Sequence, residues 1–413
     1  MPNQHKIFND PVHGFISVRF KIIFDIIEHP WFQRLRRIKQ LGLTEYVYPG
    51  ALHTRFHHAL GAMHLMQMAI YTLRDKGQVI SEEEEVGVLI AILLHDIGHG
   101  PYSHTLEHCL IKGVSHEEIS RIIISKLNKE FGLQLSLAIQ IFENKYHKKF
   151  LHQLVSSQLD TDRLDYLTRD SFFTGVSEGV VGYDRILKMM DVVDDELVIE
   201  AKGIYSIEKF IIARRLMYWQ VYLHKTVLCV EQMMIKAISR ARQLIKRGVE
   251  LPATSDLNYF LKNNISLDSF KTDDEALHHF TMLDDIDVFS ALKMWRYADD
   301  LILSELCTAI VDRKLFKIEI TDTPPSNDRI NILQKAMARK KDISIEDAGY
   351  LVFTESTGNH AYNPNAGRIG ILNKNGKVVD IAEASDQLNI MVLSKPVIKY
   401  YLCYPKNMEL PSE

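Results

Sequence analysis

The sequence has few cysteines, and it has no hydrophobic run long enough to cross a membrane. Four cysteines are spread over 413 residues without a CxxC pair. This spacing argues against a disulfide scaffold or a zinc finger and is typical of a reducing compartment. The longest apolar stretch, Val86–Leu94, is far shorter than the roughly 20 residues of a membrane helix, and the first residues contain no signal-peptide core. We therefore expect a cytoplasmic protein that does not bind a membrane.

An excess of positive charge is also absent. The chain carries 49 Lys and Arg residues against 53 Asp and Glu residues, so its formal net charge is −4. Proteins that coat nucleic acid usually carry a strong positive excess, so we do not expect a nucleic-acid partner. The composition, 46% hydrophobic and 25% charged, is that of a folded globular protein with length for two or three domains.

Histidine, in contrast, is concentrated in one part of the chain. There are 18 histidines, and more than half of them fall between His53 and His152. Histidine serves both as a metal ligand and as a proton donor or acceptor near neutral pH. We therefore expect the chemistry of the protein in this region.

The hydrophobic spacing predicts a mainly α protein. Apolar residues recur at intervals of three and four from about Lys21 to Arg313. Ser81 is the expected N-cap of a central helix that includes Val86–Leu94. A second, long helix is expected over 206–246, and it could be continuous because no Pro interrupts it. The stretch 196–205 is expected to form a short hairpin that turns at Lys202 and Gly203.

The last part of the chain reads as a small α+β region. We expect a helical domain over residues 1–320 and this smaller region over 321–413, with a linker near Thr323. The elements expected around and after the boundary are a strand at Leu315–Ile320, a helix at Asn327–Lys340, a hairpin of Gly370–Leu372 with Lys377–Ile381, and a last strand at Val397–Tyr404.

The pair His95 and Asp96 is the sharpest local motif, because it stands where the central helix should end. Imidazole and carboxylate ligands suit Mg, Mn, Fe or Zn, although the pair alone equally fits a solvated helix end. A histidine pair lies upstream at 57–58, and an Asp-rich run lies downstream at 160–165. One upstream His, the pair and one downstream Asp would surround a single ion and leave positions open for water and substrate. From the residues alone, either upstream histidine and either of the first two aspartates could serve.

Six motifs in order resemble those of the deoxynucleoside triphosphate triphosphohydrolases, a group of the HD superfamily of metal-dependent phosphohydrolases. The motifs are FNDPVHG, FQRLRRIKQLG, YPGALHTRFHHALG, HDIGHGPYSH, SHEE and DTDRLDYLTRD. The resemblance as a whole extends from about Phe8 to Lys225. The resemblance implies an HD-type helical core, one divalent ion (Mg, Mn, Fe or Zn) and a homo-oligomer, either dimer or tetramer. It further implies hydrolysis of a dNTP to deoxynucleoside and triphosphate by attack at the α-phosphorus.

The resemblance also implies roles for the histidines and acids. Its metal ligands correspond to His58, His95, Asp96 and Asp162, which leaves His57 as a packing or hydrogen-bonding neighbour. Its catalytic group corresponds to His99, His104, Glu107 and His116. In that group His104 would protonate the leaving 5′ oxygen, His99 would stabilise charge on the α-phosphate, and the other two would orient His104.

The expected substrate contacts combine helical spacing with the same resemblance. Arg163, Tyr166 and Asp170 share one helix face, and Arg214, Tyr218 and Tyr222 would share another, although an aromatic stripe is equally typical of a core. The vertebrate enzyme of the family has a His where this chain has Tyr218. The full set of implied substrate-binding residues is Gln40, Leu41, Arg55, Asp160, Arg163, Tyr166, Asp170, Arg214, Tyr218 and Tyr222.

A basic run from Arg34 to Lys39 has two readings. It fits an ordinary solvated helix face. In the vertebrate enzyme the matching region forms a regulatory nucleotide pocket, whose residues would correspond to Asn9, Glu28, Gln33 and Arg36.

Two other classes of function remain as alternatives. The first is an HD-type phosphatase or phosphodiesterase that acts on another nucleotide, but the HDxxED and GYP signatures of two such branches are absent. The second is a protein that binds a nucleotide without turnover. That reading would require broken metal ligands, and all four are present.

Overall fold

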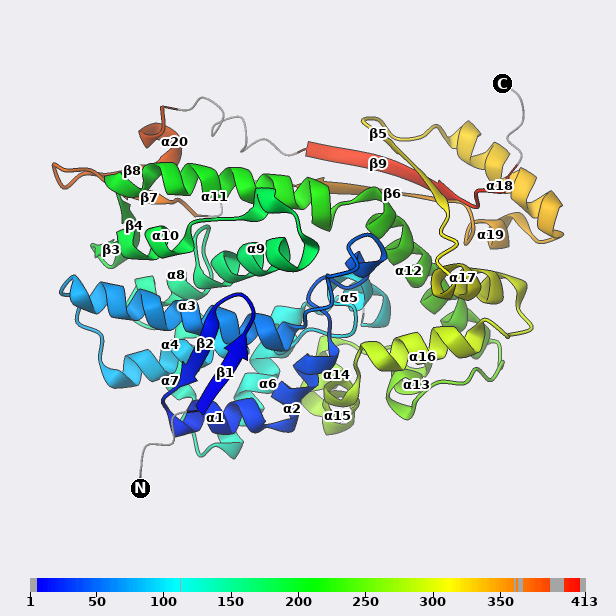
Figure 1. The fold of residues 1–413 in the computed structure, drawn as a ribbon. Helices are drawn as coiled ribbons and strands as arrows, with labels where there is room; N and C mark the ends of the chain where they lie inside the picture. Colours follow the sequence, from blue (N-terminus) through cyan, green and yellow to red (C-terminus); the bar gives the residue numbers. More distant parts are fainter. Residues whose placement is uncertain (1–5, 112, 360–361, 363–366, 387–396, 409–413) are drawn as a thin grey trace.

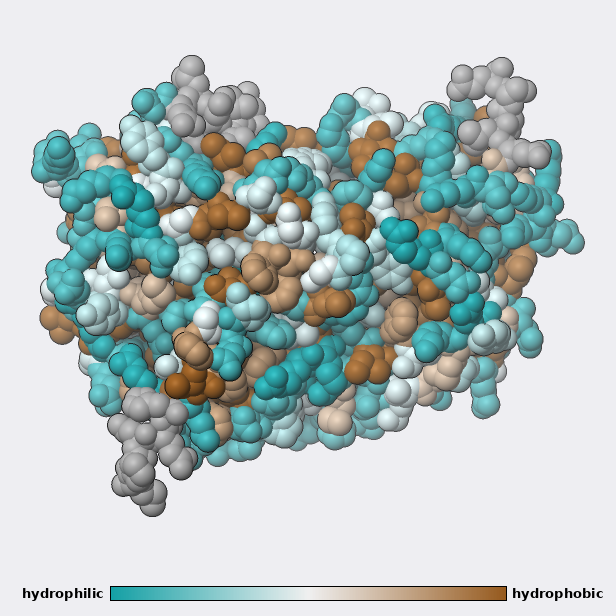
Figure 2. Space-filling view, in the orientation of Figure 1, coloured by the Kyte–Doolittle hydropathy of each residue, from teal (hydrophilic) through white to brown (hydrophobic). Residues whose placement is uncertain are grey.

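The computed structural model describes residues 6–111, 113–359, 362, 367–386 and 397–408, except for the side chains at 104, 108 and 359. Helices make up the body of the molecule, and the nine strands of this part form three small sheets (Figure 1). The mainly α prediction is therefore confirmed. In the described residues no helix combines the length and the apolar character that a bilayer span requires. Figure 2 shows one face as mostly hydrophilic, with hydrophobic residues in separate small groups.

The helices divide into two runs along the chain. The first run consists of α1 (Lys21–Glu28), α2 (Pro30–Gln33), α3 (Arg55–Asp75), α4 (Glu82–Leu94), α5 (His104–Leu110), α6 (His116–Glu130), α7 (Ser136–Phe142), α8 (Lys149–Val155), α9 (Thr161–Thr174) and α10 (Tyr183–Met189). The second run consists of α11 (Ile204–Met217), α12 (Lys225–Lys246), α13 (Ser255–Lys262), α14 (Leu267–Thr272), α15 (Asp274–Met282), α16 (Asp285–Trp295), α17 (Leu301–Val311), α18 (Asn327–Lys341), α19 (Ile345–Ala348) and α20 (Ile381–Ala384).

The strands form one hairpin, one mixed sheet and one antiparallel sheet. They are β1 (Lys6–Asp10), β2 (Gly14–Val18), β3 (Met190–Val193), β4 (Glu196–Glu200), β5 (Lys317–Thr321), β6 (Phe353–Asn359), β7 (Gly370–Leu372), β8 (Val378–Asp380) and β9 (Val397–Tyr404). The hairpin is β1–β2, and the sheets have the strand orders β3-β4-β7-β8 and β5-β9-β6.

Helices α3, α4 and α9 form the centre of the molecule, where α3 packs against both of the others. Every side chain from Val88 to Leu94 in α4 is buried. Ser81 caps this helix by accepting a hydrogen bond from the backbone N–H of Glu84 at 3.1 Å, as predicted. Because the N-cap fixes where α4 begins and the apolar run fixes how far it is buried, His95 and Asp96 follow its last turn in the interior.

The long helix expected over 206–246 is interrupted. Helix α11 ends at Met217, a π-helical turn occupies Tyr218–Tyr222, and α12 begins only at Lys225. The ring of His224 caps α12 by accepting from the backbone N–H of Thr226 at 3.2 Å. The prediction of an uninterrupted helix is therefore wrong. The sequence did not reveal the break, because no Pro or Gly marks a π-turn. Such turns occur often at functional sites, and this one carries both tyrosines of the expected substrate face.

The hairpin expected at 196–205 is also displaced. The chain turns at Asp194 and Asp195, which have φ angles of 51° and 64°, between β3 and β4. Residues Ala201–Gly203 instead form a short 3₁₀ turn ahead of α11. Aspartate tolerates the left-handed region better than most residues, so the turn can form without glycine.

The elements expected after residue 315 are confirmed. Strands β5 and β9, helix α18 and the β7–β8 hairpin lie within one or two residues of the expected positions. Strand β7 pairs in parallel with β4, so part of the C-terminal chain completes a sheet that begins in the helical part. In Figure 1, β9 and β6 lie above α12. The division at residue 320 stays a prediction.

Candidate active site

Three of the four expected metal ligands meet at one point. His58 comes from the first turns of α3, His95 follows α4, and Asp162 lies in the first turn of α9. Oδ1 of Asp162 lies 3.1 Å from Nε2 of His58 and 3.5 Å from Nε2 of His95. One ligand atom of each residue lies within 4.8 Å of the others, so the three side chains could hold a metal ion.

The histidine rings are oriented as ligands. His58 donates from Nδ1 to Oδ2 of Asp165 at 2.8 Å, and His95 donates from Nδ1 to the carbonyl of Ile92 at 2.6 Å. Both Nε2 atoms are buried, and neither makes a hydrogen bond with any residue in the described part of the chain. Two buried nitrogens that face a carboxylate, each fixed from the opposite side of its ring, are what a divalent cation requires. The residues present therefore fit a metal.

Asp96 lies beside this cluster. Its Oδ1 lies 3.3 Å from Nε2 of His95 and 3.3 Å from Nε2 of His99, and its Oδ2 lies 3.8 Å from Nε2 of His58. The same Oδ2 accepts a short hydrogen bond from Arg55. Burial opposes ionisation of Asp96, but His95, Arg55 and His99 together hold its pKa well below the usual range. The carboxylate is thus ionised and close enough to serve as the fourth ligand.

The charges of the cluster favour a cation. Burial disfavours a charged His58, yet its contacts with Asp162 and Asp165 outweigh burial and raise its pKa to about 10. His58 and His95 lower the pKa of Asp162, although burial alone would raise it. A proton therefore binds tightly where these groups meet, and a divalent cation can take its place.

A buried network behind His58 was missed by the sequence analysis. Asp165 accepts from His13 at 2.6 Å and from Arg169 at 2.9 Å, and Arg169 in turn donates to Asp10 at 2.7 Å. A Cβ at Gly61 would lie 2.0 Å from Oδ1 of Asp165, so only glycine allows the close approach. The sequence did contain a signal, because these residues stand in three of the quoted motifs, FNDPVHG, YPGALHTRFHHALG and DTDRLDYLTRD.

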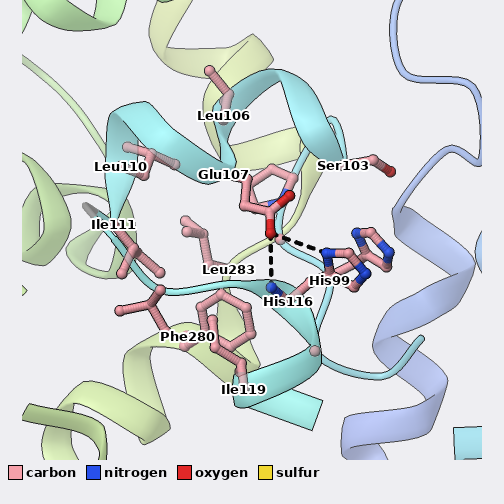
Figure 3. Close-up of a pocket in the computed structure, with 14 residues that line it drawn as sticks. His99, Ser103, Leu106, Glu107, Leu110, Ile111, His116, Ile119, Phe280 and Leu283 are labelled. Carbon is pink, nitrogen blue, oxygen red and sulfur yellow. Dashed lines mark hydrogen bonds and ion pairs between the residues drawn. The ribbon is translucent and has the colours of Figure 1, made fainter. Parts of the chain in front are cut away.

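The expected catalytic group lies next to the cluster. The rings of His99 and His116 stack with centroids 3.9 Å apart. Glu107 of α5 accepts hydrogen bonds from the backbone N–H of His116 at 2.7 Å and from its Nδ1 at 3.0 Å (Figure 3). His104 begins α5 one turn before Glu107, but its side chain lies outside the described residues. Burial and the nearby Arg55 hold the pKa of His99 well below its usual value, so its ring is neutral.

A cavity of about 770 Å³ opens beside these residues. Asp162 and Glu107 form part of its wall, so it reaches both the metal cluster and the catalytic group. Nine of the ten expected substrate-binding residues also line it, namely Gln40, Leu41, Arg55, Arg163, Tyr166, Asp170, Arg214, Tyr218 and Tyr222. The structure thus brings together side chains that are up to 182 residues apart in the sequence, from Gln40 to Tyr222.

Asp160 is the exception. It caps α9 by accepting from the backbone N–H groups of Ser157 and Arg163, both at 2.7 Å, and it forms a short ion pair with the Arg163 guanidinium. Burial raises the pKa of Asp160 to about 6, with the positive charge of Arg163 opposing that shift. Asp160 therefore positions Arg163 and does not itself face the cavity.

One tyrosine of the cavity, Tyr222, is held in place by a carboxylate. The hydroxyl of Tyr222 donates to Oδ2 of Asp170 at 2.8 Å, and His53 binds the other oxygen of Asp170 at 2.7 Å. The ring of Tyr222 meets those of Tyr218 and Tyr166 edge to face, with centroids 5.1 Å and 6.2 Å away. These contacts restrict the position of the Tyr222 ring, so it can limit the size of the group that binds beside it.

Comparison with known proteins shows the family of this chain. Residues 55–170 match the HD domain, and residues 181–256 match the HD associated region. A solved phosphohydrolase of Bacteroides thetaiotaomicron is 53% identical and superposes with a TM-score of 0.94, with 97% of this chain and all of that chain covered. This chain belongs to the HD-domain phosphohydrolases. The predicted family, fold class and enzyme class, a metal-dependent phosphohydrolase, are confirmed.

Curated relatives of this HD-domain enzyme extend the comparison. The uncharacterized protein YwfO of Bacillus subtilis is 32% identical over 98% of this chain and 93% of its own length. The human deoxynucleoside triphosphate triphosphohydrolase SAMHD1 is 31% identical over 58% of this chain and 45% of its own length. This chain therefore spans about half the length of SAMHD1 relatives.

The expected regulatory residues of the HD-domain enzyme lie outside this cavity. Arg36 donates from Nε to Oε1 of Gln33 at 2.8 Å and stacks over Phe56 at 3.6 Å, while Asn9 and Glu28 are exposed. A separate hollow of about 440 Å³ includes Arg36 in its wall but none of the other three. The regulatory site stays a prediction.

The cavity residues that the sequence analysis did not identify include five polar residues from the second half of the chain of this HD-domain enzyme. They come from α12 and from the sheet β5-β9-β6, and they are Glu231, Gln232, Ser356, Thr357 and Tyr401. No local motif marks them, because β6 and β9 reach the cavity through long-range packing. Burial raises the pKa of Glu231 to about 7, although its hydrogen bond with Thr105 opposes the shift.

Proposed function

We propose that this enzyme hydrolyses deoxynucleoside triphosphates to deoxynucleoside and triphosphate, by attack of water at the α-phosphorus. The observation that carries the proposal is a nucleotide-sized cavity lined by Arg55, Arg163 and Arg214, with Asp162 of the metal cluster in the same wall. The names of the SAMHD1 relatives support a dNTP as the substrate. We take His58, His95, Asp96 and Asp162 as the ligands of one divalent ion, whether Mg, Mn, Fe or Zn.

A divalent ion held by these residues would neutralise charge on the α-phosphate and lower the pKa of water for the attack. The protein itself supplies the orientation of the ligands. Asp165 and the Ile92 carbonyl fix the two rings, and Arg55 holds Asp96 in place. This arrangement leaves the cavity side of the cluster open to the substrate.

The three arginines bind the triphosphate. Arg163 and Arg214 both line the cavity, so their guanidinium groups can reach phosphate oxygens. Asp160 fixes Arg163, and Gln158 accepts from Arg214 at 3.3 Å. Pre-oriented guanidinium groups suit phosphate recognition better than lysine, because each presents a planar fork of donors.

The catalytic group delivers the proton. His104 donates it to the 5′ oxygen as the P–O5′ bond breaks, so the deoxynucleoside leaves neutral. His99 stabilises charge on the α-phosphate, and Glu107 with His116 positions His104 from the adjoining turn. The hydrogen bonds from His116 to Glu107 support this role, because they fix Glu107 one turn after His104 on α5.

The sugar lies against Gln40, Leu41 and the tyrosine wall. Tyr222 cannot swing away without breaking its hydrogen bond to Asp170. A fixed ring beside C2′ leaves no room for a ribose hydroxyl, so the enzyme favours dNTPs over NTPs. The rings of Tyr166 and Tyr218 both pack edge to face against this ring.

The test is a panel of dNTPs, NTPs and phosphodiesters with Mg²⁺ or Mn²⁺, in ¹⁸O-labelled water with products resolved by chromatography. We expect equal amounts of deoxynucleoside and triphosphate, with the label in the triphosphate. Release of orthophosphate or monophosphate would favour the alternative, an HD phosphatase or phosphodiesterase. Label in the nucleoside would place the attack at C5′ and contradict the proposal.

Regulation and assembly complete the proposal. We propose a homo-oligomer, either dimer or tetramer, and a regulatory nucleotide bound near Asn9, Glu28, Gln33 and Arg36. Light scattering measures the assembly with and without nucleotide. Activity that stays constant with every added GTP or dNTP, and that Arg36→Ala leaves unchanged, would exclude the regulatory site.

A further inference from the structure

Four carboxylates line the substrate cavity, and one of them differs from the rest. Three lie within ion-pair distance of a histidine, and these are Glu107, Asp162 and Asp170. Glu231 of α12 is the fourth. Within the described part of the chain it has no Lys, Arg or His at ion-pair distance, and Thr105 is its hydrogen-bond partner. Glu231 is half-buried in the cavity wall, and a partly desolvated carboxylate without a cation is costly unless a ligand supplies donors.

The position of Glu231 indicates which part of the ligand it meets. A Cβ at Gly42 would lie 3.9 Å from Oε1 of Glu231, so the carboxylate lies beside the segment that follows Gln40 and Leu41. The triphosphate is anionic and belongs with the arginines, since a neighbouring carboxylate would repel it. The nucleoside end of the substrate therefore meets Glu231.

The surroundings of Glu231 are polar but uncharged. Gln232 follows it on α12, and Tyr401 of β9 hydrogen-bonds with Gln232. Ser356 and Thr357 of β6 complete this wall of the cavity. Among the common bases, guanine alone presents two adjacent donors, N1–H and the N2 amino group, which match the two acceptor oxygens of a carboxylate. Adenine and cytosine each place an acceptor next to the donor, which would face the carboxylate unfavourably.

We propose that Glu231 recognises the base of the substrate through a bidentate contact with guanine, so that dGTP is the preferred dNTP. This inference rests on the proposed function, and it assigns the base specificity of the same cavity. Guanine binding stabilises the ionised carboxylate, because both of its oxygens then accept hydrogen bonds. Gln232 and Tyr401 lie where they can meet the remaining polar edge of the base.

The experiment compares kcat/KM for the four dNTPs in the wild type, Glu231→Gln and Glu231→Ala. We expect the wild type to prefer dGTP and Glu231→Gln to lose roughly 10- to 100-fold in kcat/KM for dGTP. The amide offers one donor and one acceptor, which match adenine, so the ratio of dATP to dGTP should rise in that variant. Glu231→Ala should lose the preference for guanine without gaining one for adenine. Glu83→Gln, an exposed change on α4, is the matched control.

The outcomes separate the two proposals. If triphosphate is released but Glu231→Gln keeps the wild-type ratio of dGTP to dATP, base recognition by Glu231 is wrong and the proposed function stands. If the wild type releases triphosphate from none of the dNTPs, both proposals fall. Thermal unfolding of each variant shows whether a lost activity reflects an unfolded protein, and in that case the ratio in Glu231→Ala decides.

Discussion

The two sides of the substrate cavity are built in different ways. The metal side draws on the ends of α3, α4 and α9, and its carboxylates are buried next to histidines and arginines. The far side draws on α12 and the sheet β5-β9-β6, and Glu231 there has no cationic partner within the described residues. On the metal side the carboxylates already have charged partners in the protein, and only a metal ion has to be added. On the far side a ligand has to supply the further hydrogen-bond donors that Glu231 needs.

This difference separates chemistry from selection. Rigid, mutually paired groups suit a reaction that must be the same for every substrate. A wall from distant segments can change its residues without disturbing the cluster, which suits it to set specificity. Changes on the metal side should therefore affect turnover and metal binding, whereas changes on the far side should affect substrate choice and KM.

The largest effect should follow from His58→Ala. The change removes one ligand and leaves Asp162 and Asp165 without their shared partner, so metal binding and turnover should be lost together. Asp96→Ala should act in the same way. Metal content by mass spectrometry and triphosphate release measure the two quantities. The control is His57→Ala on the same helix, because Nδ1 of His57 binds Thr54 and not the cluster. Loss of metal in the control would place the ligand set elsewhere.

His104→Ala should have the next largest effect. The metal should stay bound, because no ligand is removed, while dNTP turnover falls by roughly 10²–10⁴-fold. A substrate that carries p-nitrophenolate in place of the deoxynucleoside needs no proton on its leaving group. On that substrate the variant should match the wild type. Equal losses on both substrates would show that His104 does not act as the acid.

The sequence was informative about the metal side for a physical reason. His58, His95, Asp96 and Asp162 each stand at a helix end, and helix ends are marked locally by caps such as Ser81 and by apolar runs such as that of α4. The family resemblance then removed the choice between neighbouring residues. The buried network through Asp165 lay within quoted motifs, but its contacts with His13 join residues 152 positions apart.

The remaining walls of the cavity, the π-turn and the far side, could not be derived in the same way. Tyr218 and Tyr222 sit on a π-turn that no Pro or Gly announces, and the expected straight helix would have spaced them differently. Tyr401 reaches the cavity because β9 pairs with both β5 and β6, a register that depends on strand pairing across the C-terminal region. The alternation of polar and apolar residues predicts where a strand lies in the sequence, but it does not predict which part of the protein the sheet will pack against.

Asp165→Asn should test the support of the metal side with a smaller effect. An amide at 165 can no longer accept from both His13 and His58, so His58 loses its fixed orientation. Metal affinity should fall by about 10- to 100-fold, as titration of the metal-free protein would measure. Asp160→Asn is the matched comparison on α9, because Asp160 holds Arg163. That change should raise KM and leave metal affinity unchanged. Equal loss of affinity in both variants would indicate general damage to α9.

The smallest effect should come from Tyr401→Phe, which removes the hydroxyl that meets Gln232 in the far wall. One lost hydrogen bond corresponds to about 0.5–1.5 kcal/mol, so KM for the preferred dNTP should rise by roughly 2- to 10-fold with kcat unchanged. Tyr404→Phe is the control on the same strand, because its hydroxyl donates to Glu319 outside the cavity at 2.6 Å. Metal affinity should be constant in both variants. If Tyr401→Phe instead lowered kcat or weakened metal binding, the two sides of the cavity would be coupled, and the division between chemistry and selection would be wrong.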